Sequence, residues 1–144
     1  MKNDFCSTTF QVVAKLLIIS IVVSCKSPEK VKLEQFYVNG QELYEQNCAN
    51  CHQKDGLGFK DLYPPIAGSD FLKNKEAVIC MIRNGASGEM TVNGKVYNQQ
   101  MPANAQLYDL DIAAITTYIY NKWGNESAIT ETDSVKKVLQ RCSK

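Results

Sequence analysis

The chain has 144 residues, enough for one domain, and its 44% hydrophobic and 22% charged residues are typical of a globular protein. This composition excludes a chain that is disordered throughout. The formal net charge is only +1, so the chain lacks the basic field of a nucleic-acid-binding protein, and we expect no nucleic-acid partner.

Residues 1–24 have the pattern of an export signal, with Lys2 near the start and a run over 12–23 that is apolar apart from Lys15 and Ser20. The run is shorter than the roughly 20 apolar residues that a bilayer span needs. It ends in Val-Val-Ser-Cys, which resembles a bacterial lipobox with Cys25 as the lipidated first residue of the mature chain. The alternatives are an ordinary signal peptide and an uncleaved anchor.

Lipidation of Cys25 would hold the mature protein at a membrane surface. Residues 25–36 mix charges with a proline and scattered apolar side chains, so we expect them to form a tether. Removal of residues 1–24 leaves equal numbers of basic and acidic residues, so docking to partners cannot depend on overall charge.

A first helix is predicted over about 40–51, with Asn39 as its N-cap and Glu42 completing a capping box. Gly40 inside a helix costs up to about 1 kcal/mol relative to alanine. Close approach of a second helix, near Tyr44, would compensate for this cost. Alternatively, Gly40 belongs to a turn before the helix.

This helix ends in Cys48-Ala49-Asn50-Cys51-His52, the attachment signature of c-type haem. Cys48 and Cys51 lie three residues apart, so one helical turn presents both sulfurs to the two vinyl groups of one porphyrin. His52 would be the proximal iron ligand, and as the only histidine in the chain it excludes ligation by two histidines. Half of a zinc site and a thioredoxin-like thiol pair are the alternative interpretations of the cysteines.

The loop after the motif has a specific task beside a haem. A metal-bound histidine usually donates its other ring proton to an acceptor, which fixes the ring and raises its donor strength. The carbonyl of Pro64 is the expected acceptor, and Ile66 is expected to cover one haem edge. Alternatively, Pro64 and Pro65 only shape a turn.

A second helix and a β-hairpin are predicted next, over about 73–83 and 90–97. The hairpin signal is Asn93-Gly94 between two short β-type runs. Met101 follows in a loop, and the proline after it stiffens the backbone, so its thioether is well placed to reach a metal. The buried row of the helix is expected to be Ala77, Val78, Met81 and Ile82.

Two more helices and a disulfide complete the prediction. A helix over about 109–123 carries an apolar row and ends before a glycine, and a shorter helix is expected over about 132–141. Cys80 and Cys142 are left over, and in an oxidising compartment we expect them to form a disulfide. The alternative is two buried free thiols. The apolar row consists of Ile112, Ile115, Ile119 and Trp123.

Together these features resemble the class I monohaem cytochromes c. The resemblance implies an all-α fold over residues 37–124, a small helical shell around one covalently bound haem, here with a short β-hairpin insertion and a C-terminal tail over 125–144. The hairpin, Cys25 and the additional cysteine pair are similar to bacterial lipoprotein cytochromes. The resemblance rests on Gly40, Tyr44, the motif at 48–52, Pro64-x-Ile66-x-Gly68, Met101-Pro102, Ile115 and Tyr118. Tyr108 departs from it, because relatives usually place a capping residue there.

Three methionines remain after signal removal as candidates for the second axial ligand. Met81 falls on an apolar helix face and is expected in the core, and Met90 begins the hairpin, so Met101 is the expected ligand. Methionine sulfur favours ferrous iron and raises the reduction potential. The predicted haem-binding residues are therefore Cys48, Cys51, His52, Pro64, Ile66 and Met101.

The expected function is one-electron transfer by a membrane-tethered carrier in the periplasm. Its partners would be a reductase or dehydrogenase as donor and a terminal oxidase or reductase as acceptor. One alternative is an electron-transfer subunit of a larger dehydrogenase or oxidase complex, and another is a haem enzyme or gas sensor with an open iron site. A zinc-binding module that uses Cys48, Cys51, Cys80 and Cys142 is the alternative without haem.

Overall fold

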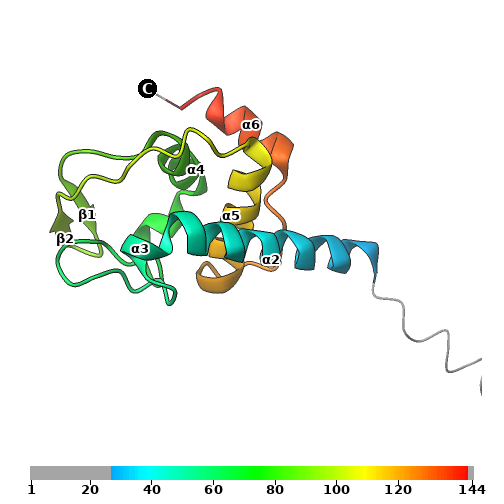
Figure 1. Cartoon of the computed structure of the whole chain (residues 1–144), viewed down its shortest axis with the longest axis horizontal. Coiled ribbons are helices and arrows are strands. Elements are labelled where there is room, and N and C mark those ends of the chain that lie inside the picture. The colour runs from blue at the N-terminus through cyan, green and yellow to red at the C-terminus, as the bar shows by residue number, and fades with distance from the viewer. Residues whose placement is uncertain (1–26, 143–144) are drawn as a thin grey trace, which may run out of the picture. The chain divides into compact units, whose positions relative to one another are not determined.

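The computed structural model describes residues 27–142, so the expected signal segment and Cys25 lie outside the described residues. The chain divides into two units after Val31, and the core and the site described below lie in the larger one, which begins at Lys32. The fold is mostly helical with one small antiparallel sheet, which confirms the predicted class (Figure 1). The elements are α2 (Pro28–Asn47), α3 (Ala49–His52), η2 (Asp70–Lys73), α4 (Lys75–Asn84), β1 (Met90–Val92), β2 (Lys95–Tyr97), α5 (Asp109–Trp123) and α6 (Thr132–Leu139).

Helix α2 begins at Pro28, so the expected start near Gly40 is wrong. Ser27 caps the helix, because its hydroxyl accepts a hydrogen bond from Lys30 N at 3.4 Å. Proline is favoured at the first helical position, where its missing N–H has no intrahelical partner to lose. Most side chains over 28–39 are exposed. This exposure explains the polar composition that suggested a tether.

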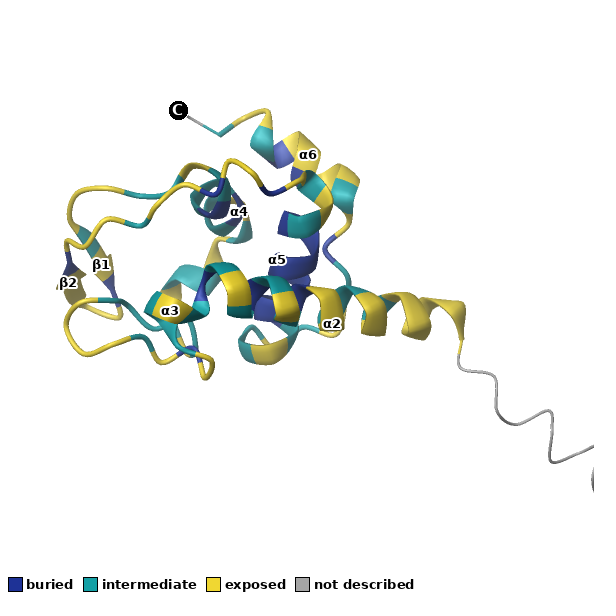
Figure 2. Ribbon diagram, in the orientation of Figure 1, coloured by how far each residue is buried: buried dark blue, intermediate teal, exposed yellow. Residues whose placement is uncertain are grey.

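Helices α2 and α5 cross at Gly40. A Cβ atom on Gly40 would lie 2.0 Å from the carbonyl oxygen of Ala114 and 2.9 Å from Cβ of Tyr118, so only glycine allows this approach. Tyr44 packs on Tyr118 one turn later, with ring centroids 5.4 Å apart. Helix α5 is buried on all sides from Ile112 to Tyr120 and forms the centre of the core (Figure 2). The predicted helix contact at Gly40 is therefore confirmed.

The predicted start of α5 is also confirmed, although Tyr108 is not a favoured capping residue. The carboxylate of Asp111 accepts a hydrogen bond from Tyr108 N at 2.7 Å, which supplies one half of a capping box. Asp109 in the first turn pairs with Arg83 of α4 at 2.7 Å.

Helix α4 has apolar side chains on two sides. Ile79, which the predicted row omitted, is 2% exposed and belongs to the core beside α5. Ile82 is buried as expected, whereas Met81 is only half-buried. The prediction that Met81 is a core residue is therefore wrong.

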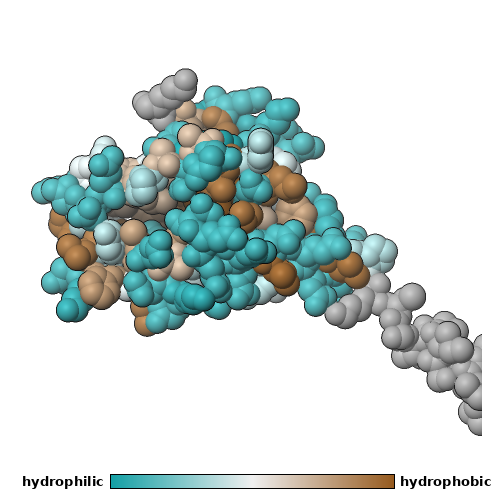
Figure 3. Space-filling view, in the orientation of Figure 1, coloured by the Kyte–Doolittle hydropathy of each residue, from teal (hydrophilic) through white to brown (hydrophobic). Residues whose placement is uncertain are grey.

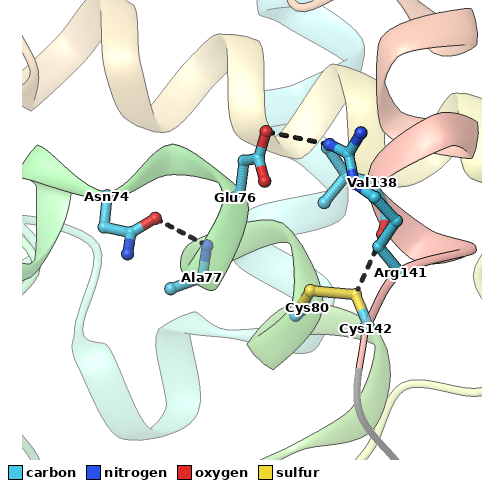
Figure 4. Close-up of a disulfide and its surroundings, with 7 residues drawn as sticks. All are labelled: Asn74, Glu76, Ala77, Cys80, Val138, Arg141 and Cys142. Carbon is cyan, nitrogen blue, oxygen red and sulfur yellow. Dashed lines mark hydrogen bonds and ion pairs between the residues drawn. A yellow bond between two sulfur atoms is a disulfide. The ribbon is translucent and has the colours of Figure 1, made fainter.

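The predicted disulfide between Cys80 and Cys142 is present, with Cα atoms 5.5 Å apart. It ties α4 to the segment that follows α6, and an ion pair between Arg141 and Glu76 at 2.9 Å lies beside it (Figure 4). Helix α6 buries Val135 and Val138 in the same core.

The predicted hairpin is confirmed, with Met90 opposite Tyr97 and Val92 opposite Lys95. Asn93 and Gly94 both have positive φ, 51° and 77°, as a type I′ turn requires. The Asn93 side chain accepts from Asp70 N at 2.8 Å, and the Asp70 carboxylate accepts from Asn93 N at 3.0 Å. The hairpin is thus fixed to η2. Over residues 27–142, none of the helices has the length and apolar character needed to cross a membrane.

Candidate functional site

The Cys-x-x-Cys-His motif forms one helical turn at the end of α2. Cys48 lies between α2 and α3, and its carbonyl accepts from Cys51 N at 3.2 Å and from His52 N at 2.9 Å. Both thiols are free, Cys48 is buried and Cys51 is half-buried. All three motif side chains border the same cavity, as the spacing predicts.

This cavity, about 740 Å³ when its open mouth is included, adjoins a second hollow of about 590 Å³ defined in the same way. Cys48, His52 and Pro64 border both spaces, as do the three methionines. In Figure 3, apolar side chains come to the surface between the regions that α3 and α4 occupy in Figure 1. The second hollow has apolar walls that include Ile66, Leu72, Val78, Ile82, Val92 and Ile119.

The imidazole of His52 is held by the loop that follows it. Its Nδ1 lies 3.0 Å from the carbonyl oxygen of Pro64, and because a carbonyl only accepts, Nδ1 carries the proton. The predicted hydrogen bond is therefore present, and Nε2 keeps a free lone pair. Burial lowers the pKa of His52, while the bond to Pro64 acts in the opposite direction. At neutral pH the ring is uncharged, which is the state that binds a metal.

The two thiols do not suit the alternative interpretations. Burial and the neighbouring Cys51 raise the pKa of Cys48 to about 12, whereas a redox-active thiol pair needs a lowered pKa. Cys80 and Cys142 are bonded to each other and cannot complete a four-cysteine zinc site. In the part of the chain that the structure describes, no group of three or more His, Cys, Asp or Glu side chains could hold a metal ion.

All three methionines within residues 27–142 border the cavity, so proximity alone does not select Met101. Its backbone, however, is fixed on both sides: Met101 N donates to Ala86 O at 2.9 Å, and Ala86 N donates to Met101 O at 3.0 Å. Gly85 packs so closely that a Cβ there would lie 2.4 Å from the Met101 oxygen. The loop that carries Met101 is therefore held rigidly at the cavity.

The hairpin contributes more to the cavity than its sequence predicts. Met90 and Tyr97, which are opposite each other in the sheet, border the first space, and Val92 borders the second. The available signal was the alternation of Met90, Val92 and Tyr97 on one face of the hairpin. The hairpin is thus a wall of the site.

The model of the cytochrome c family matches residues 37–123, a range that contains the motif turn, the Pro64 loop and Met101. The chain belongs to the cytochrome c family. It is an electron-transfer cytochrome, and members of this family hold haem c, with its iron, through covalent bonds. The family assignment confirms the predicted fold and cofactor.

Individual relatives support the assignment. Cytochrome c-552 of Thermus thermophilus is 35% identical over 96 residues, which cover 63% of this chain and 72% of the relative. The fructose dehydrogenase cytochrome subunit of Gluconobacter japonicus is 36% identical over 109 residues, or 69% of this chain and 22% of the relative. The cytochrome c subunit of a quinone alcohol dehydrogenase from Gluconacetobacter polyoxogenes is 28% identical over 105 residues. The chain thus spans only about a fifth of the dehydrogenase subunits it matches.

The residues present fit haem c. Two free thiols lie on one helical turn, an uncharged imidazole borders the same cavity, and methionine residues border that cavity as well. Apolar walls suit the porphyrin ring.

Proposed function

We propose that this cytochrome is a one-electron carrier in which Cys48 and Cys51 attach the haem and His52 and Met101 ligate its iron. The observation that carries the proposal is that one cavity is bordered by both thiols, by the uncharged His52 and by the fixed Met101 loop. When bound, haem c supplies a one-electron couple at its iron.

The chain's own residues would keep the ligands in place during electron transfer. The Pro64 carbonyl orients the His52 ring and raises its donor strength. The paired backbone of Met101 and Ala86 holds the thioether, and Ile66 with its apolar neighbours keeps water away from the site. Two protein ligands that do not move favour a carrier over an enzyme, which needs an open coordination position.

The methionine assignment is tested by three matched variants, Met101→Ala, Met81→Ala and Met90→Ala. We expect only Met101→Ala to lose the sulfur-to-iron absorption band, to lower the reduction potential and to let the ferrous protein bind carbon monoxide. Loss of the band in one of the other two variants would transfer the role to that methionine. Carbon monoxide binding by the unmodified protein would support a gas sensor or haem enzyme instead.

A second candidate function is that of an electron-transfer subunit in a larger complex. The likeness to subunits of fructose and alcohol dehydrogenases favours it. Under either function the donor would be a reductase or dehydrogenase and the acceptor a terminal oxidase or reductase. Purification from native membranes under mild conditions separates the two functions, because a subunit remains with its complex and a carrier does not.

We further propose that the protein is exported to the periplasm and held at the membrane by a lipid on Cys25. Residues 1–24 and the Val-Val-Ser-Cys sequence support this proposal. The variant Cys25→Ser should move the haem protein from the membrane fraction to the soluble fraction. Continued retention in the membrane fraction would count against lipidation.

A further inference from the structure

The backbone directly after His52 has an unusual conformation. Gln53 has φ 63° and ψ 162°, a region that is essentially restricted to glycine. A residue with a side chain persists there only when its surroundings hold it. Gln53 therefore marks a point at which the fold forces the chain into the turn that follows the proximal histidine.

Neighbouring residues hold Gln53 in this conformation through hydrogen bonds to its carbonyl oxygen. It accepts a hydrogen bond from the hydroxyl of Tyr44 at 2.7 Å and another from Gly56 N at 3.2 Å. The Gln53 side chain, by contrast, reaches only Asn50 O, at 3.5 Å and in an exposed position. The restraint acts through the backbone of Gln53, and Tyr44 makes the shorter of the two bonds.

Tyr44 is itself rigidly placed. It is 0% exposed, and its ring packs against Tyr118 and Trp123 with centroid distances of 5.4 Å in both cases. Burial raises the pKa of its phenol, so the hydroxyl remains a donor. Trp123 also packs closely against the turn, because a Cβ atom added to Gly56 would lie only 2.7 Å from Cζ2 of Trp123.

Two sets of backbone hydrogen bonds connect the restrained turn to His52. Gly58 N donates to the carbonyl of His52 at 3.0 Å. The Gly56 carbonyl accepts from Ile66 N at 2.7 Å and from Ala67 N at 2.9 Å. These bonds fix the segment just after Pro64, whose carbonyl accepts the proton of the His52 ring.

We propose that Tyr44 is a positioning residue for His52: its hydroxyl holds the turn at Gln53 and so fixes the Pro64 carbonyl that sets the donor strength of the imidazole. This role rests on the haem ligation proposed above. It adds to the packing role at the helix crossing, which an aromatic ring without a hydroxyl would fill equally well.

The test is the variant Tyr44→Phe in the haem-loaded protein, which keeps the ring and removes the hydroxyl. Without the Tyr44 hydroxyl, the hydrogen bond between His52 and the Pro64 carbonyl weakens, and His52 becomes a poorer electron donor to ferric iron. We therefore expect the reduction potential to rise. We also expect amide hydrogen exchange at Gly56 and Gly58 to become roughly 2- to 10-fold faster, the range for one lost hydrogen bond. The ferric electron paramagnetic resonance spectrum should shift, because it reports the orientation of the axial imidazole.

Two control variants separate positioning from general destabilisation. Tyr120→Phe removes the same group from another buried tyrosine, whose hydroxyl donates to Leu72 O at 2.9 Å, and we expect it to leave the potential and the spectrum unchanged. Gln53→Ala removes only the side chain and should behave like the unmodified protein. A third variant, Trp123→Phe, is not a control, because it loosens the packing on Gly56. It should change the reduction potential and the ferric spectrum in the same direction as Tyr44→Phe, to a smaller extent.

An unchanged potential and unchanged exchange in Tyr44→Phe would overturn the positioning role, as would equal shifts in Tyr120→Phe. An unmodified protein without covalent haem would overturn the proposed function, and this role with it. An unmodified protein with the expected low-spin spectrum, combined with a silent Tyr44→Phe, would overturn the positioning role alone.

Discussion

Replacement of Gly40 by alanine tests the helix crossing on which the core depends. The added Cβ would lie 2.0 Å from the Ala114 oxygen, whereas ordinary contacts begin at 3.4 Å, so the two helices would have to separate by about 1.4 Å at this point. The two nearest obstructing atoms, the carbonyl oxygen and carbon of Ala114, belong to the backbone and cannot rotate away. Overpacking of this kind costs about 1–3 kcal/mol, and here it falls at the upper end because the Tyr44–Tyr118 contact opens as well.

The gain in helix propensity from glycine to alanine, about 1 kcal/mol, opposes this loss. We therefore expect Gly40→Ala to lower the free energy of unfolding by about 2 kcal/mol, measured by denaturant unfolding of the haem-loaded protein with far-UV circular dichroism. Asn39→Ala is the matched control, since Asn39 is exposed on the same helix and its replacement gains propensity without a clash. If Gly40→Ala were as stable as Asn39→Ala, the close approach would not be what requires glycine at this position.

Three further predictions concern contacts of the C-terminal segment. Replacement of Cys80 and Cys142 by serine opens a loop with a sequence separation of 62, for which the chain-entropy relation gives about 4 kcal/mol, so the denaturation midpoint should fall markedly and the reductant dependence should disappear. The hydroxyl of Thr117 accepts from the buried Thr130 N at 2.9 Å, so Thr117→Val should destabilise by about 1–3 kcal/mol. The Thr130 hydroxyl is buried without a partner, so Thr130→Val should be neutral or stabilising by up to about 1 kcal/mol in the same unfolding assay, and a large loss would show that this hydroxyl has a partner.

The features that sequence predicts well are those in which neighbouring residues decide the chemistry. The turn at Asn93-Gly94 and the placement of Cys48 and Cys51 on one helical turn each depend on a few adjacent residues. The start of α2 was also encoded locally, by Ser27 and Pro28, but the polar composition of the following residues suggested a tether. Composition was the weaker signal, because an exposed helix and a flexible segment have similar side chains.

Contacts between distant segments account for what could not be predicted. Ile79 and Met81 lie two residues apart in one helix, but only the placement of α5 decides that Ile79 enters the core and Met81 borders the cavity. The bond from Tyr44 to Gln53 likewise depends on how the chain turns after the motif. A helical pattern identifies Tyr44 as a packing residue and gives no sign that its hydroxyl is used.

The position of Met101 follows from helix α4 more than from the sequence around the methionine. The loop is paired with Ala86, which comes directly after the glycine that ends α4. The buried Asn104 then ties the loop back to that helix, since its side chain donates to Ile82 O at 3.1 Å. Helix α4 in turn is fixed to α5 by Arg83 and to the C-terminal segment by the disulfide. The position of the Met101 backbone therefore depends on the packing of α4 against α5 and α6, because Ala86, which pairs with Met101, directly follows that helix.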